Sequence, residues 1–484
     1  ARFANLAQSP KAMGERLLEH SQEDEKPKLY PIRFVQIAVY FFILFSFGFA
    51  QNAFAPVQNV VRDTYDQSAI NVNLLAMVIP ICNVPLSFGT GYLFAHRGLR
   101  FSLITAAVGP LLVSGWVRYA GSISGVRSFG VVFLGQVVGA CGMPAGLAAS
   151  ALLSETWFSE EGRTIATAVG GLAPIIGSVA SALVAPAMFT DGASRDENYE
   201  SFSTFMLVMA VANTVVAIAA GAGLRNQPPT PPSLSAANDR AHHSETEQIS
   251  LRESIRGALS NFHLVTLMIV FGGGYGSINA LTTLINQILS PLGYSNDDIG
   301  NISASMGLGV VGSFVFGFLL DVFKRHVLTL KLCAVASGIF FLLFEIFLYV
   351  VPGQHPWLLF ATFGLQGFFG IPIVPMVLEI GVETLYPMHE AVSAAFLWQS
   401  GNLLGLVFVV TATYMQQPCV DTPQPGGGSA CVYQPDSMLH AMIFLGAMFG
   451  LAVLGSLSFH GPLKRQEYGR QQREELARPL SLNA

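Results

Sequence analysis

Long apolar stretches separated by short polar segments make up most of the chain. Windows of about 20 or more residues, dominated by apolar side chains, are long enough to cross the hydrocarbon core of a bilayer as helices. Twelve such windows occur, at 33–63, 69–95, 100–121, 127–154, 164–189, 201–224, 261–290, 297–321, 327–351, 356–386, 389–415 and 437–460. The pattern predicts an all-α membrane protein with twelve transmembrane helices.

The polar segments divide the chain into five predicted parts. Residues 33–224 and 261–460 carry six windows each and form two six-helix bundles, which we expect to be related by pseudo-symmetry. Residues 225–260 begin with a Pro-rich run and continue with mixed charges, which is typical of a disordered linker. Residues 1–32 and 461–484 are predicted to be polar tails.

The two halves repeat sequence features at a nearly constant spacing of 226 to 228 residues. The repeated pairs are Glu155 with Glu383, Gln58-Asn59 with Asn286-Gln287, and Gly91 with Gly317. Duplicated halves built of membrane helices are typical of secondary transporters, whose substrate site lies near the midplane between the halves.

Composition supports a membrane protein and excludes several functions. Charged residues make up 11% of the chain and hydrophobic residues 52%, whereas a soluble protein has about a quarter charged residues. A net charge of -5 gives no support to nucleic-acid binding. The run Gly307-Leu-Gly309-Val-Val-Gly312 matches a dinucleotide fingerprint, but no strand precedes it. Without Walker A, GxSxG or metal-ligand spacing, we expect no enzymatic activity, no cofactor and no metal.

The distribution of positive charges predicts the orientation. If both termini are cytoplasmic, 21 of the 25 Lys and Arg residues face the cytoplasm, and only Arg62, Arg118, Arg127 and Arg195 do not. The last polar loop then faces an oxidising compartment, so we expect Cys419 and Cys431 to form a disulfide. Two unpaired loop thiols are the alternative. The membrane is predicted to be the plasma membrane or an endolysosomal membrane.

Two predicted cytoplasmic loops carry a glycine followed by a cluster of charged residues. This arrangement resembles the loop motif of the major facilitator superfamily, whose Asp caps a neighbouring helix and pairs with Arg at the closed cytoplasmic gate. The first loop has Ala95 at the position of that Asp. Simple anchoring by positive charge is the alternative. The gate residues implied by this resemblance are Arg97, Arg100, Glu155, Asp321, Arg325 and Glu383.

Amide side chains gather on the windows that line the cavity in that superfamily, which are the first, fourth, seventh and tenth, and the eleventh window adds Gln399 and Asn402. A polar group at lipid depth needs a partner, so each amide indicates a helix–helix hydrogen bond or a water-filled cavity. We expect substrate to bind at Asn52, Gln58, Gln136, Tyr275, Asn279, Gln366, Gln399 and Asn402.

Charges within the windows are few. Because no Lys or Arg lies deep in a window, anionic substrates are disfavoured. Among the carboxylates, Glu379 is the candidate for proton coupling, since it lies deeper than Glu383 in the tenth window.

Several stretches are similar to solute carrier family 49, the feline leukaemia virus subgroup C receptor group, and the first two of those named next are most similar to its disrupted-in-renal-carcinoma branch. They are Ala55-Pro-Val-Gln-Asn59, Leu153-Ser-Glu-Thr-Trp-Phe-Ser159, Thr283-Leu-Ile-Asn-Gln-Ile288, Gly317-Phe-Leu-Leu-Asp321 and Glu379-Ile-Gly-Val-Glu-Thr-Leu-Tyr-Pro387. The resemblance implies a carrier of choline, ethanolamine or pyridoxine, and haem export has also been proposed for the family. Choline-carrying members hold the quaternary ammonium between a Trp and a Tyr.

At the positions of that Trp and Tyr, this sequence has Pro56 and Asn279. This difference favours a neutral or weakly basic ring compound such as pyridoxine. We therefore predict a secondary transporter, facilitative or proton-linked, that moves a small polar organic solute, pyridoxine-like or an amino alcohol, by alternating access. It is expected to work as a monomer among membrane lipids. A haem exporter, a transport-inactive receptor and an accessory subunit of a larger membrane assembly are the alternatives.

Overall fold

The computed structural model describes residues 28–190, 193–232, 259–323, 325–353, 355–385, 390–423 and 429–460. Within these ranges, twelve helical spans are long and apolar enough to cross a membrane, which confirms the number predicted from the hydrophobic pattern. The predicted tails and most of the predicted linker lie outside the described residues, so the boundaries of the five parts stay predictions.

The N half comprises the first six spans. Its elements are α2 (Ile32–Asn52), η1 (Ala55–Val57), α3 (Gln58–Tyr65), α4 (Ala69–Leu103), the π-helix η2 (Ile104–Val108), α5 (Gly109–Ser122), α6 (Phe129–Trp157), α7 (Glu160–Ala187) and α8 (Arg195–Gly223).

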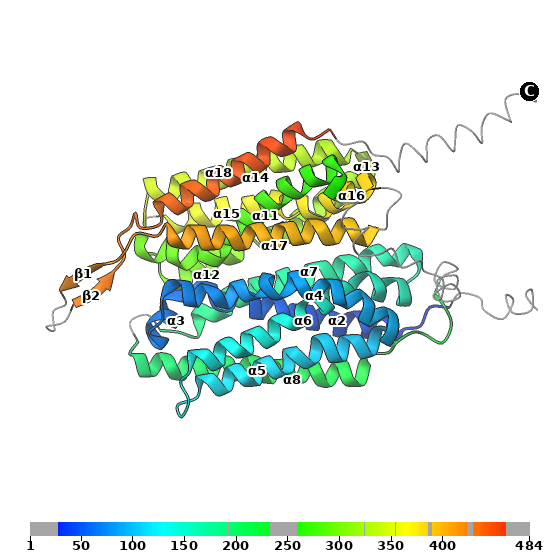
Figure 1. Ribbon diagram of the computed structural model, residues 1–484, viewed down its shortest axis with the longest axis horizontal. Coiled ribbons are helices and arrows are strands. Elements are labelled where there is room, and N and C mark those ends of the chain that lie inside the picture. The colour runs from blue at the N-terminus through cyan, green and yellow to red at the C-terminus, as the bar shows by residue number, and fades with distance from the viewer. Residues whose placement is uncertain are drawn as a thin grey trace, which may run out of the picture.

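The C half comprises the other six spans and lies against the N half along the length of the helices (Figure 1). Its elements are α11 (Phe262–Leu289), η3 (Ser290–Leu292), α12 (Asn296–Ser305), α13 (Leu308–Phe323), α14 (His326–Val350), α15 (Pro356–Gly370), α16 (Ile373–Leu385), α17 (Glu390–Tyr414), β1 (Val420–Pro423), β2 (Ser429–Val432) and α18 (Leu439–Ser458).

Both halves pack their helices in the same order. In the N half, the first span packs on the fifth (α2 on α7) and the third packs on the fourth and sixth (α5 on α6 and α8). In the C half, the seventh span packs on the eleventh (α11 on α17) and the ninth packs on the tenth and twelfth (α14 on α15 and α18). The repeated packing agrees with the duplication seen in the sequence.

Several spans are interrupted at Pro or Gly. The first span is broken between α2 and α3 at Pro56, and the tenth is broken between α15 and α16 beside Pro372. The second and third spans run together in α4 across a kink at Gly98, where φ is 75°. A positive φ is easily adopted only by glycine, so Gly98 allows the chain to reverse without a long loop.

Each half has its own apolar core, and the outer surface is also apolar. The core clusters of the N half are built around Phe47 and Phe202, and those of the C half around Phe344 and Leu267. Large side chains such as Phe262, which is 77% exposed, cover the outside of the helices. Apolar residues on the outside are expected when lipid rather than water surrounds the protein.

A short antiparallel strand pair joins α17 to α18 and projects from one end of the molecule (Figure 1). We call this the ribbon end, and it also holds α3 and η3. The opposite end, which holds Ile32, Gly98 and Phe262, is called the linker end. The hydrophobic pattern predicted a loop between the last two spans and missed these two strands, because four-residue strands in a polar segment leave little periodic signal.

Cysteines divide into two groups. Cys82, Cys141 and Cys333 are free, whereas Cys419 is disulfide-bonded. The strand register places Cys431 opposite Asp421, two residues along from Cys419. The side chain of Cys431 lies outside the described residues, so its pairing with Cys419 stays a prediction.

Alkylation of the intact protein is expected to modify three thiols before reduction and five after it. Intact-mass spectrometry measures the difference, and a peptide linking Cys419 to Cys431 in a non-reduced digest identifies the pair. Cys431→Ser should leave Cys419 open to alkylation. Four or more modified thiols before reduction in the wild type would contradict the pairing.

Candidate functional site

The break in the first span leaves backbone groups without partners inside the helix. Gln136 Nε2 of α6 donates to one of them, Ala50 O, at 3.4 Å, and Ser178 Oγ of α7 donates to Gly48 O, near the end of α2, at 3.0 Å. At membrane depth, non-helical backbone is stable only when other groups satisfy it. The break is therefore built into the packing of the N half.

Asn286 of α11 binds the same break from the C half. Its Nδ2 donates to Pro56 O at 2.7 Å and to Asn296 Oδ1 at 3.1 Å, while its Oδ1 accepts from the backbone N of Asn59 at 2.9 Å. The side chain is 1% exposed. One carboxamide thus fastens the C half to the 3-10 turn η1 and to the start of α3.

Next to Asn286, a chain of hydrogen bonds crosses between the halves a second time. Asn73 Nδ2 of α4 donates to Thr413 Oγ1 of α17 at 2.8 Å, and Asn73 Oδ1 accepts from Gln58 Nε2 and, at 3.0 Å, from Gln287 Nε2. These residues are at most 9% exposed. We call Gln58, Asn73, Asn286, Gln287 and Thr413 the amide clasp. All five of its side chains are neutral.

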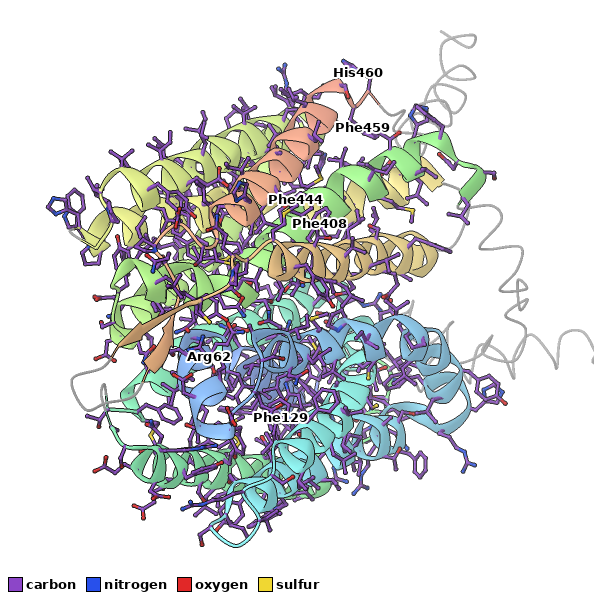
Figure 2. All side chains as sticks on the ribbon, turned by 60° about the vertical axis from the view of Figure 1, so that its left-hand side comes forward. Arg62, Phe129, Phe408, Phe444, Phe459 and His460 are labelled. Atoms are coloured by element: carbon purple, nitrogen blue, oxygen red, sulfur yellow. The ribbon has the colours of Figure 1, made fainter. Side chains whose placement is uncertain are left out.

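A cavity of about 240 Å³ lies beside the amide clasp at the ribbon end. Figure 2 shows Arg62 at this end, between α3 and the strand pair. Its Nε is 2.8 Å from Asp63 Oδ1, and its guanidinium carbon lies 5.2 Å from the centre of the Tyr433 ring. The lining residues are Gln58, Asn59, Arg62, Ala69, Asn286, Gln287, Ser290, Pro291, Gln416 and Tyr433.

Two helix pairs complete the contact between the halves. Toward the ribbon end, α12 packs on α7 so closely that a Cβ on Gly300 would overlap Ala182 O and the Pro186 ring. Nearer the middle, α17 packs on α4, and Gln399 Nε2 donates to Ser87 Oγ at 3.0 Å. Gln399, a predicted binding residue, thus lies at the interface between the halves.

Three predicted binding residues lie within a single half. Gln366 is fully buried and its Nε2 donates to Ser337 Oγ at 3.4 Å. Gln136 is 3% exposed, and Asn52 Nδ2 contacts Ser178 O at 3.5 Å. These contacts correspond to the helix–helix alternative that the sequence left open for each amide, and the substrate-binding role of these residues stays a prediction.

Three others lie close together on α11 and α17. The Tyr275 ring is 5.5 Å from the Trp398 ring, edge to face. One helical turn further along, Asn279 Nδ2 lies beside Gly405, and Asn402 is 8% exposed. The three residues lie on two helices that pack on each other, and their substrate-binding role stays a prediction. The one residue of the predicted set that lines the 240 Å³ cavity is Gln58.

Arg118, near the end of its span, is a buried cation that the sequence did not identify. Its side chain on α5 is fully buried in the N half. Nη1 donates to Gln136 Oε1 at 3.1 Å and Nε donates to Ser114 O at 3.3 Å. The sequence placed Arg118 near the end of its window, but the guanidinium packs against α6 and is bound by Gln136, so it is held within the N half.

Gln136→Leu is expected to destabilise the protein by about 2 kcal/mol, because it removes a hydrogen bond to a buried charged group. Thermal unfolding of the purified protein measures the effect. Gln366→Leu is the matched control, since it also truncates a buried glutamine but affects no cation, and about 1 kcal/mol is expected for it. Equal losses in the two variants would contradict a special role for the Arg118 contact.

At the linker end, the predicted gate residues are largely open to solvent. Arg97 lies over the Phe101 ring, and Arg100 Nη2 donates to Gly221 O at 2.9 Å, which is a contact inside the N half. Arg325 is exposed and Glu383 is buried. The side chain of Asp321 lies outside the described residues. The closed gate that these residues are predicted to form therefore stays a prediction.

Glu379 lies at the linker end of the C half. Its Oε1 is 3.2 Å from His326 Nε2, and its side chain is 54% exposed. The carboxylate pairs within one half, and its role in proton coupling stays a prediction.

Sequence reasoning missed Asn73, Thr413 and Arg118. Asn73 is a polar residue near the start of an otherwise apolar window, and this signal is as strong as the one that identified Gln58. Thr413 gave no signal, because a threonine can bond to its own helix, as its Oγ1 does to Val409 O at 2.7 Å.

Comparison with known proteins gives a family match and several relatives. The model of the Major Facilitator Superfamily matches residues 40–410. Solute carrier family 49 member A3 of Xenopus tropicalis is 28% identical over 426 residues, which cover 85% of this chain and 84% of that protein. The choline/ethanolamine transporter FLVCR1 of Mus musculus is 28% identical over 403 residues, which cover 79% of this chain and 70% of that protein.

Solved structures share the fold. The crystal structure of a D-xylose-proton symporter has a TM-score of 0.66 at 14% identity and covers 90% of this chain and 99% of that one. A bacterial homologue of the lysosomal transporter Spinster, solved in an inward-facing conformation, has a TM-score of 0.63 at 13% identity and covers 89% of this chain and 98% of that one.

Proposed function

The chain belongs to the Major Facilitator Superfamily, whose match covers most of its length, and we propose that it carries a small polar organic solute across the membrane by alternating access. The observation that supports this most is the amide clasp. It fastens two separately packed halves at the ribbon end, on the side where the strand pair projects. Transport then requires the clasp to open while the linker end closes.

The chemistry of the clasp suits a contact that is broken and remade. Each hydrogen bond between neutral groups contributes only about 0.5–1.5 kcal/mol net, because water replaces the partner when the bond breaks. Buried ion pairs would raise a larger desolvation barrier to separation and re-formation. A few amide bonds give a closed state that thermal energy and solute binding are able to shift.

The same chemistry supports an uncharged or weakly basic solute. The interface between the halves offers carboxamides and hydroxyls, and the aromatic positions that hold choline in related carriers are Pro56 and Asn279 here. Buried carboxamides recognise hydroxyl, amine and ring-nitrogen groups without needing a counter-charge. Pyridoxine-like compounds fit this description better than choline, and an amino alcohol remains the second candidate.

We propose the outer side of the membrane for the ribbon end, with both termini in the cytoplasm. The distribution of Lys and Arg supports this orientation, and so does a disulfide at Cys419, because disulfides persist in oxidising compartments. The plasma membrane and an endolysosomal membrane both meet this condition.

Uptake of pyridoxine, choline, ethanolamine and haem into proteoliposomes, with empty liposomes as the control, tests the function. Saturable uptake of pyridoxine is expected, together with exchange of labelled for unlabelled solute across the membrane. Purified, folded protein that moves none of the four solutes would contradict the proposal and favour a receptor or accessory subunit. Saturable flux of haem alone would favour the exporter.

Facilitative transport is expected, because the Glu379 carboxylate is half exposed and its partner His326 belongs to the same half. Glu379→Gln should therefore leave pyridoxine uptake within about twofold of the wild type, with and without a pH gradient. The wild type measured in parallel is the reference. Loss of pH-driven accumulation in this variant, with exchange preserved, would instead assign proton coupling to Glu379.

A further inference from the structure

The turn between the second and third spans brings three arginines to one corner of the linker end. Arg97 and Arg100 lie on either side of the kink at Gly98. The backbone N of Arg100 donates to Asn226 Oδ1 at 2.8 Å, which fastens the turn to the segment that follows α8. Arg225 is the neighbour of Asn226 in the chain, so it is held beside the same turn. We call Arg97, Arg100 and Arg225 the basic corner.

The basic corner has no acidic partner. Its three side chains are exposed, and among the described residues no carboxylate forms an ion pair with any of them. The stretches 69–108 and 201–232, which supply the turn and the end of α8, contain no Asp or Glu. Guanidinium groups without a carboxylate partner are available to phosphate oxygens, which they bind with the same planar geometry.

Exposed aromatic side chains place the corner at the level of the lipid headgroups. Tyr92 is 67% exposed, and its ring stacks on His96 with the ring centres 3.9 Å apart. Phe101 is 46% exposed, and the guanidinium carbon of Arg97 lies 5.5 Å from the centre of its ring. Aromatic and cationic side chains that occur together at the ends of spans are typical of the interface between hydrocarbon and water.

The aromatic side of the corner faces lipid rather than the C half. Ser87 marks the side of α4 that contacts the C half, because Gln399 of α17 donates to its hydroxyl at 3.0 Å. Tyr92 follows five residues later and His96 nine residues later, which turns their side chains by roughly 140° and roughly 180° from that contact. Both rings therefore point away from α17. The proposed orientation places this end in the cytoplasmic leaflet, which contains anionic lipids.

Phosphate oxygens are common to lipid headgroups and to soluble anions, and the aromatic rings distinguish the two sources. A soluble phosphate gains nothing from the exposed faces of Tyr92 and Phe101. A phospholipid covers these rings with its acyl chains while its phosphate lies against the guanidinium groups. A choline headgroup also carries an ammonium group, which the three arginines repel, so a headgroup with a net negative charge is favoured.

We propose that the basic corner binds the headgroup of an anionic phospholipid, whose acyl chains lie along Tyr92 and Phe101. Arg100 has a second role, because its Nη2 donates to Gly221 O at 2.9 Å and so holds the turn against the end of α8. The bound lipid then bridges the start of the third span and the end of the sixth, and it stabilises the N half at the linker end. This inference does not depend on which solute is carried.

Native mass spectrometry of the purified full chain in detergent, titrated with phosphatidylglycerol or phosphatidylcholine, measures the Kd of the first lipid bound. Phosphatidylglycerol is expected to bind about tenfold more tightly or better. An arginine near a charged headgroup contributes about fivefold, so Arg97→Gln and Arg225→Gln should each raise this Kd about fivefold, and the double variant about 25-fold. Arg97→Lys keeps the charge and should stay within about twofold of the wild type.

Arg325→Gln is the matched control, because it removes the same charge from an exposed arginine at the linker end of the C half. It should change the Kd by less than twofold, and thermal unfolding without added lipid shows that each variant is folded. The inference is overturned if phosphatidylcholine binds as tightly as phosphatidylglycerol, if the double variant binds like the wild type, or if Arg325→Gln weakens binding as much. Displacement of the lipid by inorganic phosphate at a comparable concentration would also overturn it, in favour of a site for soluble anions.

Discussion

Asn286→Leu is expected to reduce solute uptake at least about tenfold while the protein remains folded. The substitution leaves Pro56 O and the Asn59 N–H without their partner in the closed clasp, although water is able to reach both when the ribbon end opens. An unsatisfied buried group costs about 1–3 kcal/mol, which shifts the equilibrium toward the open ribbon end by roughly 5- to 150-fold. A carrier held open on one side completes few cycles. Initial uptake rates in proteoliposomes measure the loss.

Asn213→Leu is the matched control for this variant. Asn213 is 3% exposed, and its Nδ2 donates to a backbone carbonyl, Leu111 O, at 3.2 Å, but both residues belong to the N half. The control should lower thermal stability by a similar amount and leave the uptake per folded molecule within about twofold. Equal loss of uptake in the two variants would show that Asn286 acts through stability rather than through the contact between the halves.

Gly300→Val is expected to abolish transport as well, by wedging α12 away from α7. A Cβ at this position overlaps Ala182 O, which is a backbone atom that cannot rotate away. Overpacking of this kind costs typically about 1–3 kcal/mol, and at an interface between two rigid halves the strain is relieved by separating them. Uptake and thermal unfolding should be measured together, since a lower uptake with a near-normal melting temperature identifies a shift between states.

Gly317→Val provides the comparison. Gly317 lies on α13 in the same span, and a Cβ there meets nothing within 4 Å, so the variant carries the same change in helix propensity without the steric conflict. Its uptake should stay within about twofold of the wild type. If Gly300→Val transports as well as Gly317→Val, the α7–α12 contact does not limit the conformational change.

The fold was predictable because lipid imposes a simple rule on sequence. A span must be apolar over about 20 residues, and this length alone located all twelve spans. The strand pair between α17 and α18 was not predictable, because outside the membrane that rule does not apply. The buried position of Arg118 was missed for another reason: its place near the end of a window shows depth along the helix but not which face of the helix it occupies.

The candidate site was predictable only in part. The repeat offset singled out Gln58-Asn59 and Asn286-Gln287, and these pairs meet at the ribbon end. Their common partner, Asn73, was not identified, because a contact between two halves depends on how the halves dock and not on the hydrophobic periodicity within either half. Gln366 illustrates the opposite case, since a buried amide on a predicted cavity helix bonds to Ser337 within one half.

The central claim is that two rigid halves separate and rejoin at the ribbon end. Pulsed dipolar spectroscopy between spin labels at Asp66 and Asp297, exposed residues on opposite halves of this end, measures it most directly. With Cys82, Cys141 and Cys333 replaced so that only the two introduced cysteines are labelled, the account predicts a short and a long distance in the wild type. Asn286→Leu and Gly300→Val should increase the long population. A single distance, unchanged by either substitution or by the transported solute, would contradict it.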